Sequence, residues 1–109
     1  MEDLKQEIHR LVTDNPVVLF IKGTPQFPQC GFSGRAVQVL KACGVKDFMY
    51  VNVLQQTPEF QAAVCDYANW PTWPQLYIRG EFIGGCDIMT EMAQAGELQQ
   101  ALGDLAVPA

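Results

Sequence analysis

The sequence predicts a single α/β domain in which helices flank a mixed sheet of four strands. Segments with apolar residues at helical spacing alternate along the chain with short runs of β-branched and aromatic residues. The first two predicted strands are separated by a helix long enough for a right-handed crossover, so they should be parallel. The last two are joined by a tight turn, so they should form an antiparallel hairpin.

The amino-terminal half is predicted to contain two helices and a strand. Apolar spacing indicates an amphipathic helix over about residues 2–14, which ends before Pro16. The run 17–21 is apolar throughout, as expected of a strand that is buried on both faces. A loop rich in Gly and Pro follows over 23–29, and helical spacing returns over about 31–43.

The carboxyl-terminal half begins with a predicted strand over 48–53. Thr57, followed by Pro and Glu, provides a capping side chain for a third helix. A hairpin is expected over 75–83, Asp87 is expected to cap a last helix, and a further helical piece is expected over 98–105. This order of elements is typical of a thioredoxin-like α/β domain.

Length and charge narrow the class of function. The chain has 109 residues with 49% hydrophobic content, which fits one domain over residues 1–109 with a substantial core. The net charge of -5 argues against nucleic acid or an anionic membrane as partner. The chain shows neither a transmembrane run nor a signal sequence, so we expect it in the cytoplasm, or in an organellar matrix if a transit peptide was removed.

The four cysteines fit a reducing compartment. Cys30, Cys43, Cys65 and Cys86 are widely spaced, and no Cys-x-x-Cys pair is present. A secreted disulfide framework would be smaller and denser in cysteine, and a structural zinc site would need paired ligands. Cys43 and Cys65 are interpreted as packing residues. His9, the single histidine, is assigned no role.

Cys30 is the most informative residue. It lies between a loop rich in Gly and Pro and the start of a helix, just beyond a buried strand. Free N–H groups and the dipole at a helix N-terminus favour a thiolate, which is both the nucleophile and the metal ligand form of cysteine. Lys22 adds positive potential nearby. The alternative is an ordinary loop cysteine.

The residue three positions after Cys30 is Ser33, where a dithiol redox site would have its second cysteine. Cys30 therefore has no adjacent resolving thiol. Any disulfide chemistry must use an external thiol or a distant cysteine.

Three separated segments resemble the monothiol glutaredoxin family. Residues 22–25 read Lys-Gly-Thr-Pro and residues 30–33 read Cys-Gly-Phe-Ser, similar to the loop and signature of that family. The segments 70–78 and 80–87 are similar to its two remaining site segments. The resemblance covers nearly the whole chain in the same order, and it implies the glutaredoxin version of the thioredoxin-like fold.

The resemblance also implies a glutathione site. It implies a cis peptide bond between Trp73 and Pro74, which would leave the backbone of Trp73 free to pair with glutathione. Cys86 and Asp87 at a helix start would offer N–H groups to one carboxylate of glutathione. Lys22 would bind the other carboxylate as a point charge.

Two residues depart from the family pattern. Trp73 is bulkier than the usual residue before the proline. Gln61 stands on the third helix where the family often has a basic residue, so a neutral amide there would bind glutathione more weakly. Cys86 should approach Cys30, and either a structural or a resolving role remains open for it.

The ligand count favours a shared [2Fe–2S] cluster. Such a cluster needs four ligands, and this chain offers one convincing thiolate, Cys30. Two chains and two glutathiones would complete the set, giving a homodimer bridged by the cluster. The resemblance implies cluster transfer to apo iron–sulfur recipient proteins and pairing with a BolA-like protein. The main alternative is a glutathione-dependent thiol-disulfide oxidoreductase acting through Cys30. A glutathione-responsive binding module is a third reading.

Overall fold

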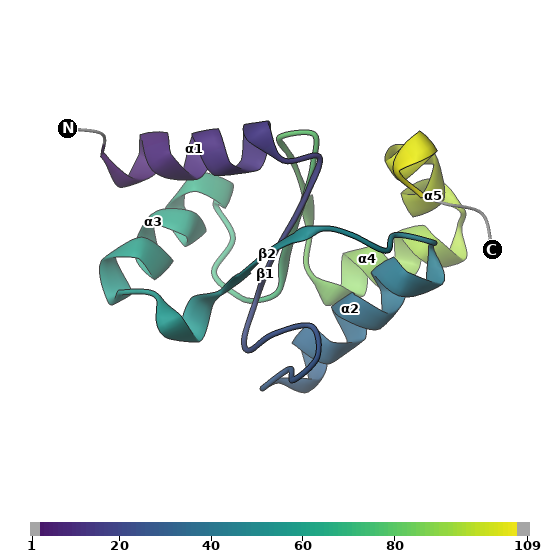
Figure 1. Ribbon diagram of the computed structural model, residues 1–109, viewed down its shortest axis with the longest axis horizontal. Coiled ribbons are helices and arrows are strands. Elements are labelled where there is room, and N and C mark those ends of the chain that lie inside the picture. The colour runs from purple at the N-terminus through teal and green to yellow at the C-terminus, as the bar shows by residue number, and fades with distance from the viewer. Residues whose placement is uncertain (1–2, 107–109) are drawn as a thin grey trace.

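The computed structural model describes residues 3–106, which form a four-stranded sheet with helices on both faces (Figure 1). The strands are β1 (Val17–Ile21), β2 (Met49–Asn52), β3 (Gln75–Ile78) and β4 (Glu81–Gly84). The helices are α1 (Leu4–Asp14), α2 (Gly31–Ala42), α3 (Pro58–Ala68), α4 (Cys86–Gln94) and α5 (Glu97–Leu102), with the short 3₁₀ helices η1 (Val53–Gln55) and η2 (Gly103–Leu105). The predicted fold class is confirmed. Over these residues, no helix has both the length and the apolar character required to cross a bilayer.

The sheet has the order β2-β1-β3-β4. β1 and β2 are parallel and connected through α2, which confirms the predicted crossover. β1 pairs with β3 in antiparallel fashion, and β3 and β4 form the predicted hairpin. β1 and β3 therefore occupy the centre of the sheet, where both faces of a strand are covered.

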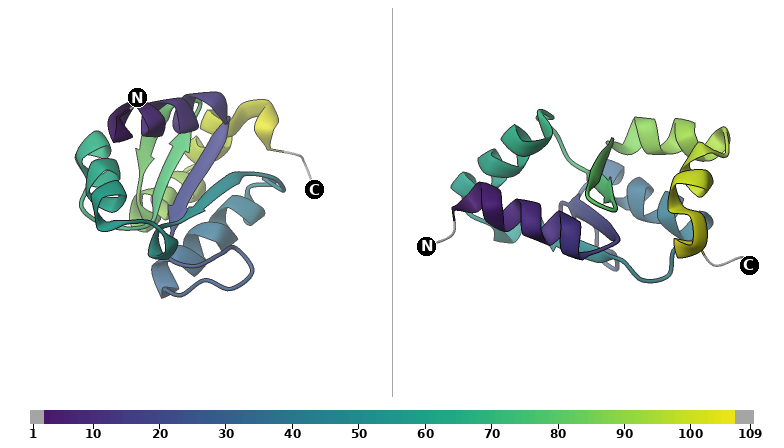
Figure 2. Two further views of the ribbon diagram at one scale, coloured as in Figure 1. Left: turned by 60° about the vertical axis from the view of Figure 1, so that its left-hand side comes forward. Right: turned by 90° about the horizontal axis from the view of Figure 1, so that it is seen from above.

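The central strand β1 contributes to two separate cores. Val17, Leu19 and Ile21 face the layer of α2, α4 and α5, whereas Val18 and Phe20 face α1 and α3. Figure 2 shows the two helical layers on opposite sides of the strands. Because alternate residues of a strand point to opposite faces, burial on both sides requires an apolar residue at every position. This burial on both faces explains why residues 17–21 are apolar without interruption.

Several element boundaries differ from the predicted ones. α1 begins after Asp3, whose carboxylate accepts a hydrogen bond from the Gln6 N–H at 2.8 Å in a reciprocal capping box. Residue 2 of the predicted helix lies outside the described residues. The second strand is shorter than predicted, because the chain turns into η1 at Val53. Asp87 does not cap the fourth helix: Gly85 is the N-cap, and Asp87 lies inside the first turn of α4.

Thr57 begins α3 as predicted. Its hydroxyl accepts a hydrogen bond from the Phe60 N–H at 3.1 Å. Pro58 occupies the first turn, where the N–H that proline lacks would have no partner within the helix. The helix ends at Asn69, which adopts a left-handed conformation with φ 52°. Both ends of α3 are thus defined by local chemistry, and this helix carries Gln61 toward the sheet.

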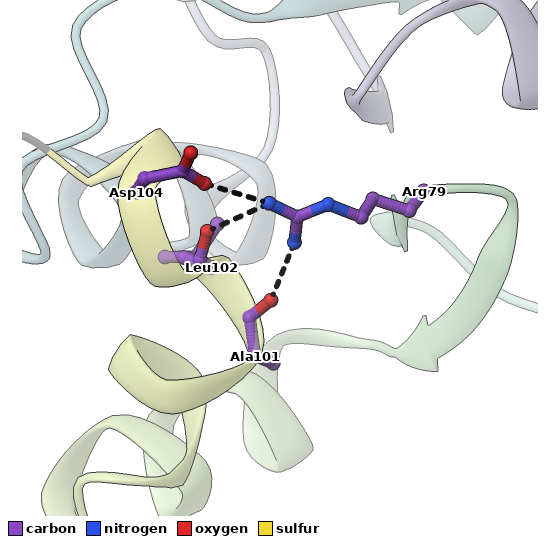
Figure 3. Close-up of polar contacts among 4 residues, drawn as sticks. All are labelled: Arg79, Ala101, Leu102 and Asp104. Atoms are coloured by element: carbon purple, nitrogen blue, oxygen red, sulfur yellow. Dashed lines mark hydrogen bonds and ion pairs between the residues drawn. The ribbon is translucent and has the colours of Figure 1, made fainter.

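Arg79 connects the hairpin turn to the carboxyl-terminal helix (Figure 3). Its guanidinium donates hydrogen bonds to the carbonyls of Ala101 at 3.0 Å and Leu102 at 3.5 Å, and it forms an ion pair with Asp104 at 3.0 Å. Its backbone N–H donates to the Pro16 carbonyl at 2.8 Å. The last carbonyls of α5 thereby gain a cationic partner, which stabilises the end of a helix.

Candidate functional site

The loop between β1 and α2 is held in one shape by its own backbone. The N–H of Gln29 donates to the Lys22 carbonyl at 2.9 Å, and Thr24 and Phe27 exchange two backbone hydrogen bonds at 3.1 and 3.3 Å. Gly23 has φ 96°, and a side chain there would lie 2.6 Å from the Phe27 carbonyl oxygen. Only glycine fits this position. The loop therefore delivers Cys30 to a defined place at the start of α2.

Cys30 is the N-cap residue of α2 and is partly exposed. The backbone N–H of Ser33 is the main cause that holds the pKa of the Cys30 thiol below its ordinary value, and partial burial acts in the opposite direction. The Phe32 N–H, the Lys22 charge and the Ser33 hydroxyl lower the pKa further. The Cys30 side chain makes no capping hydrogen bond to the first turn of α2. The thiolate-stabilising groups are in place, and the sulfur remains open toward a ligand.

Ser33 is completely buried behind Cys30. Its hydroxyl accepts a hydrogen bond from the Lys22 N–H at 3.0 Å, which links the end of β1 to the first turn of α2. A cysteine could not replace this contact well, because sulfur is a weak acceptor. The position that a dithiol site would use for its second sulfur is a structural hydroxyl in this chain.

A groove of about 730 Å³ opens beside Cys30. One wall is the segment 70–74, which contains the expected cis peptide bond between Trp73 and Pro74. Residues of α2, η1, α3 and the start of α4 also line the groove. The volume suits a short peptide or another small molecule rather than a folded partner.

All six site residues predicted from the sequence line this one groove: Lys22, Cys30, Gln61, Trp73, Cys86 and Asp87. The groove brings together segments that are far apart in the chain. Lys22 and Asp87 are its two charged lining residues, and they come from the end of β1 and the start of α4. The groove therefore offers both a cation and a helix N-terminus to an anionic ligand.

Gln61 lies in the groove, but its amide donors are occupied. Nε2 donates to the Val53 carbonyl at 2.6 Å and to the Gln56 carbonyl at 3.4 Å. Since a carbonyl can only accept, the orientation of the amide is determined by these neighbours. The Gln61 donor is thus engaged within the chain, and the residue carries no charge, in contrast to the basic residue that the resemblance leads one to expect here.

The other three cysteines differ from Cys30 in the direction of their pKa shift. Burial raises the pKa of the Cys43, Cys65 and Cys86 thiols. Cys86 is buried and lines the groove, as expected, and its pKa also feels the Thr90 hydroxyl and the Arg35 charge, which act in the lowering direction. Cys43 is buried at the end of α2, which confirms the packing role predicted for it. Cys65 is only partly buried.

Several residues of the site were not predicted. Phe32 and Leu54 line the groove while remaining 60% and 54% exposed, and Trp70 and Thr72 form part of its wall. His9 also has a partner, since its Nδ1 lies 2.8 Å from the Tyr67 hydroxyl and joins α1 to α3. Phe32 stands two positions after Cys30, inside the segment 30–33 that carries the resemblance, and this was a usable signal for it. Trp70 and Thr72 lie in the segment 70–78 that the resemblance had also marked, whereas Leu54 is brought to the groove by the fold alone.

Within residues 3–106, no three His, Cys, Asp or Glu side chains are grouped so that they could hold a metal ion. The four cysteine thiols are free. A metal centre that used Cys30 would thus need ligands from beyond the described part of this chain.

Comparison with known proteins gives consistent results. A family model described as Glutaredoxin matches residues 17–83. The chain is 52% identical to Glutaredoxin 4 of Escherichia coli over 101 residues, which is 93% of this chain and 86% of that protein. Two solved structures are similar in fold: reduced apo GrxS14 from poplar, at 47% identity and TM-score 0.79, and a glutaredoxin–glutathione complex from buckwheat, at 28% identity and TM-score 0.81. They cover 94% of this chain, which spans 92% and 89% of theirs.

Proposed function

Because the chain belongs to the glutaredoxin family, we propose that it is a monothiol glutaredoxin that binds glutathione and carries a [2Fe–2S] cluster as cargo between two subunits. The observation that supports this most is the single cysteine with a lowered pKa at a peptide-sized groove, followed by Ser33 in place of a second thiol. The function is carriage and transfer of the cluster rather than permanent storage.

Glutathione fits the groove in size and charge. It is a short anionic peptide with a thiol, and the groove combines a cysteine with one cation and the N-terminus of α4. In the proposed complex, Lys22 binds one carboxylate, the start of α4 at Cys86 and Asp87 receives the other, and the backbone of Trp73 pairs with the peptide. The complex of a related glutaredoxin from buckwheat with glutathione supports this choice of ligand.

The donor set supports a cluster shared between chains. Thiolates are the usual ligands of a [2Fe–2S] cluster, and Cys30 is the one cysteine of the described chain whose pKa is lowered. One ligand from each of two chains leaves two positions for the thiolates of two bound glutathiones. Ligands of this kind exchange with solution, which suits delivery to apo iron–sulfur proteins.

Protein partners are proposed to dock around the groove. Phe32 and Leu54 expose apolar surface on its rim, and such surface beside a reactive group is typical of a contact site. The proposed occupants are a second copy of this chain in the cluster-bridged dimer, a BolA-like protein and the apo recipients of the cluster. Nucleic acid does not fit, because the chain carries a net charge of -5.

A glutathione-dependent thiol-disulfide oxidoreductase is the second candidate. The lowered pKa of Cys30 favours it, since a thiolate is the attacking species. In this reaction the Cys30 sulfur attacks the glutathione sulfur of a mixed disulfide and releases the substrate thiol. A second glutathione then attacks the Cys30–glutathione disulfide, giving oxidised glutathione and the free Cys30 thiolate.

The deciding experiment is anaerobic reconstitution with iron, sulfide and glutathione. Wild type should give a coloured dimer by size exclusion, and Cys30→Ser should give a colourless monomer, because an alkoxide is a poor ligand for this site. Cys65→Ser is the matched control and should retain the cluster. A holo protein that remains monomeric contradicts the bridged cluster, and rapid exchange of glutathione disulfides with no cluster bound favours the oxidoreductase.

A further inference from the structure

Gln75 is one of two polar side chains that are completely buried in the described part of the chain; the other is Ser33. It is the first residue of β3 and directly follows Pro74, whose segment forms one wall of the groove. A buried amide is costly unless its donors and acceptor are all paired. The partners of Gln75 therefore indicate what the residue stabilises.

Every polar atom of the Gln75 side chain has a partner. Nε2 donates to the Trp70 carbonyl at 3.0 Å and to the Thr72 carbonyl at 3.4 Å. Oε1 accepts a hydrogen bond from the Tyr77 hydroxyl at 3.2 Å. Tyr77 lies two residues further on, on the same face of β3, as the alternation of a strand requires. Because the loop partners are carbonyls, the amide can only be oriented with Nε2 toward the loop.

Trp70 connects the segment 70–74 to β4 and to the start of α4. Its indole packs on Phe82, with ring centroids 5.6 Å apart. A Cβ on Gly85, the N-cap of α4, would lie 3.3 Å from the indole Nε1, so the ring edge rests closely against that residue. Nε1 is buried and has no hydrogen-bond acceptor among the described residues. The indole is therefore held by packing and by the Gln75 bond to the Trp70 carbonyl.

We propose that Gln75 is a positioning residue: its hydrogen bonds clamp the segment 70–74 and hold Trp70 against Gly85, and so set the shape of the groove beside Cys30. The clamp itself is independent of the ligand. Its consequence for binding rests on the proposed function, in which glutathione pairs with the backbone of Trp73 and with the start of α4. Loss of the clamp should then loosen both protein surfaces that contact glutathione, the backbone of Trp73 and the start of α4.

The chain provides a direct probe of the clamp. Both of its tryptophans, Trp70 and Trp73, belong to the clamped segment, so intrinsic tryptophan fluorescence reports on this wall alone. Gln75→Met keeps the length of the side chain and removes both donors. We expect a red-shifted emission maximum and at least about a twofold increase in acrylamide quenching, since the partly buried indoles become more accessible to water.

Two controls separate positioning from general loss of stability. Arg79→Ala removes hydrogen bonds to α5 beyond the opposite end of β3, and none of them involves the segment 70–74, so it should lower the melting temperature without changing emission or quenching. Tyr77→Phe leaves both bonds from Nε2 to the loop in place and should shift the emission less than Gln75→Met. A Gln75→Met variant with wild-type emission and quenching overturns the proposal.

A second experiment measures glutathione binding, by titrating glutathione into the reduced protein and following the titration by NMR. Gln75→Met should bind it at least about tenfold more weakly than wild type, whereas Arg79→Ala should bind it within about twofold. If wild type binds no glutathione, the proposed function fails while the fluorescence arm still tests the clamp. If Gln75→Met does not fold, Gln75→Asn takes its place. In wild type, the side-chain amide protons of Gln75 should exchange slowly, and rapid exchange contradicts the clamp.

Discussion

At the scale of single residues, the Ser33 hydroxyl has two roles in the site. It accepts the Lys22 N–H, and it is one of the groups that lower the pKa of the Cys30 thiol. Its backbone N–H has the larger effect on that pKa. A substitution that removes only the hydroxyl can therefore separate the contribution of the side chain from that of the helix start.

Ser33→Ala should raise the pKa of Cys30 toward its ordinary value without restoring it fully, because the backbone N–H groups remain. The alkylation rate of Cys30 with iodoacetamide, followed against pH, should show its midpoint at a higher pH in the variant. The thiolate is the reacting form, so the variant should react more slowly near neutral pH. The partly buried Lys22 N–H also loses its partner, which should cost about 0.5–1.5 kcal/mol of stability. An unchanged or lower midpoint contradicts this role of the hydroxyl.

Lys22 and Gln61 provide a second pair of tests in the groove. Lys22→Ala should weaken glutathione binding by about 1.5–3 kcal/mol, which is the usual worth of a hydrogen bond to a charged group. The measurement is titration with glutathione, together with decay of cluster absorbance after transfer to glutathione-free buffer. Wild-type affinity in Lys22→Ala would exclude this lysine as a ligand.

Gln61→Lys should strengthen glutathione binding, in contrast to Lys22→Ala, but it should lower the stability of the fold. The added cation strengthens the attraction for an anionic ligand, while the bonds from Nε2 to the Val53 and Gln56 carbonyls are lost. We expect tighter glutathione binding together with a lower melting temperature. Equal or weaker binding would show that the groove does not place an anionic group near α3.

At the scale of elements, the carboxyl-terminal helix depends on a side chain from a distant turn. Arg79 reaches α5 and η2 from the β3–β4 hairpin, so these elements are stabilised together. Its ion pair with Asp104 is exposed, and exposed pairs contribute little. The bonds to the Ala101 and Leu102 carbonyls should account for most of the stabilisation.

Arg79→Ala should lower the free energy of unfolding by about 1–2 kcal/mol and increase amide exchange in α5. Asp104→Ala is the control, since it removes only the exposed ion pair, and it should cost less than about 0.5 kcal/mol. Denaturant unfolding and hydrogen exchange measure the two effects. Equal losses in both variants would place the stabilisation in the ion pair.

The elements that were predicted correctly from the sequence are those determined by residues next to them in the chain. The apolar run of β1, the Thr57 cap and the Arg79-Gly80 turn each follow from neighbouring residues, and all were correctly placed. The residues of the groove, in contrast, were located through the resemblance to the monothiol glutaredoxin family, which is carried by residues 22–25, 30–33, 70–78 and 80–87. The fourth helix was predicted to start at Asp87, but Gly85 caps it without a side-chain bond, so no capping residue marks that boundary.

Gln75 was missed for a different reason. A glutamine at the end of a loop is ordinarily a solvent-exposed residue, and its partners Trp70, Thr72 and Tyr77 become visible only when the chain is folded. The occupied donors of Gln61 depend in the same way on the position of η1. Residue types could thus be assigned to the site, whereas the hydrogen bonds that orient them could not.

At the scale of the whole molecule, the core contains several acids that are held neutral by burial. Burial raises the pKa of the Tyr77 hydroxyl well above its usual range, and it also raises the pKa of the Cys43, Cys65 and Cys86 thiols. For such groups the unfolded chain loses protons first as the pH rises. Stability is therefore complete below the unfolded pKa values and falls as the pH approaches the folded ones.

The melting temperature should consequently decrease between about pH 8 and about pH 10.5, since unperturbed thiols and phenols titrate in this range. Tyr77→Phe should reduce the slope of this decrease, although it also removes the hydrogen bond to Gln75 and so lowers stability at neutral pH. Differential scanning calorimetry across the range measures both effects. A melting temperature that rises with pH would contradict the burial of these groups.

The single cation of the groove has a consequence for how the protein responds to ionic strength. In the proposed complex Lys22 attracts anionic glutathione across a solvent-accessible space, and added salt screens that attraction, so capture of the ligand should weaken. Two copies of the chain each carry a net charge of -5 and repel one another, and the same salt screens that repulsion, so their encounter should become faster. Glutathione binding in the groove and association of two subunits should therefore depend on salt in opposite directions, and assembly of the proposed bridged dimer should be fastest at an intermediate salt concentration.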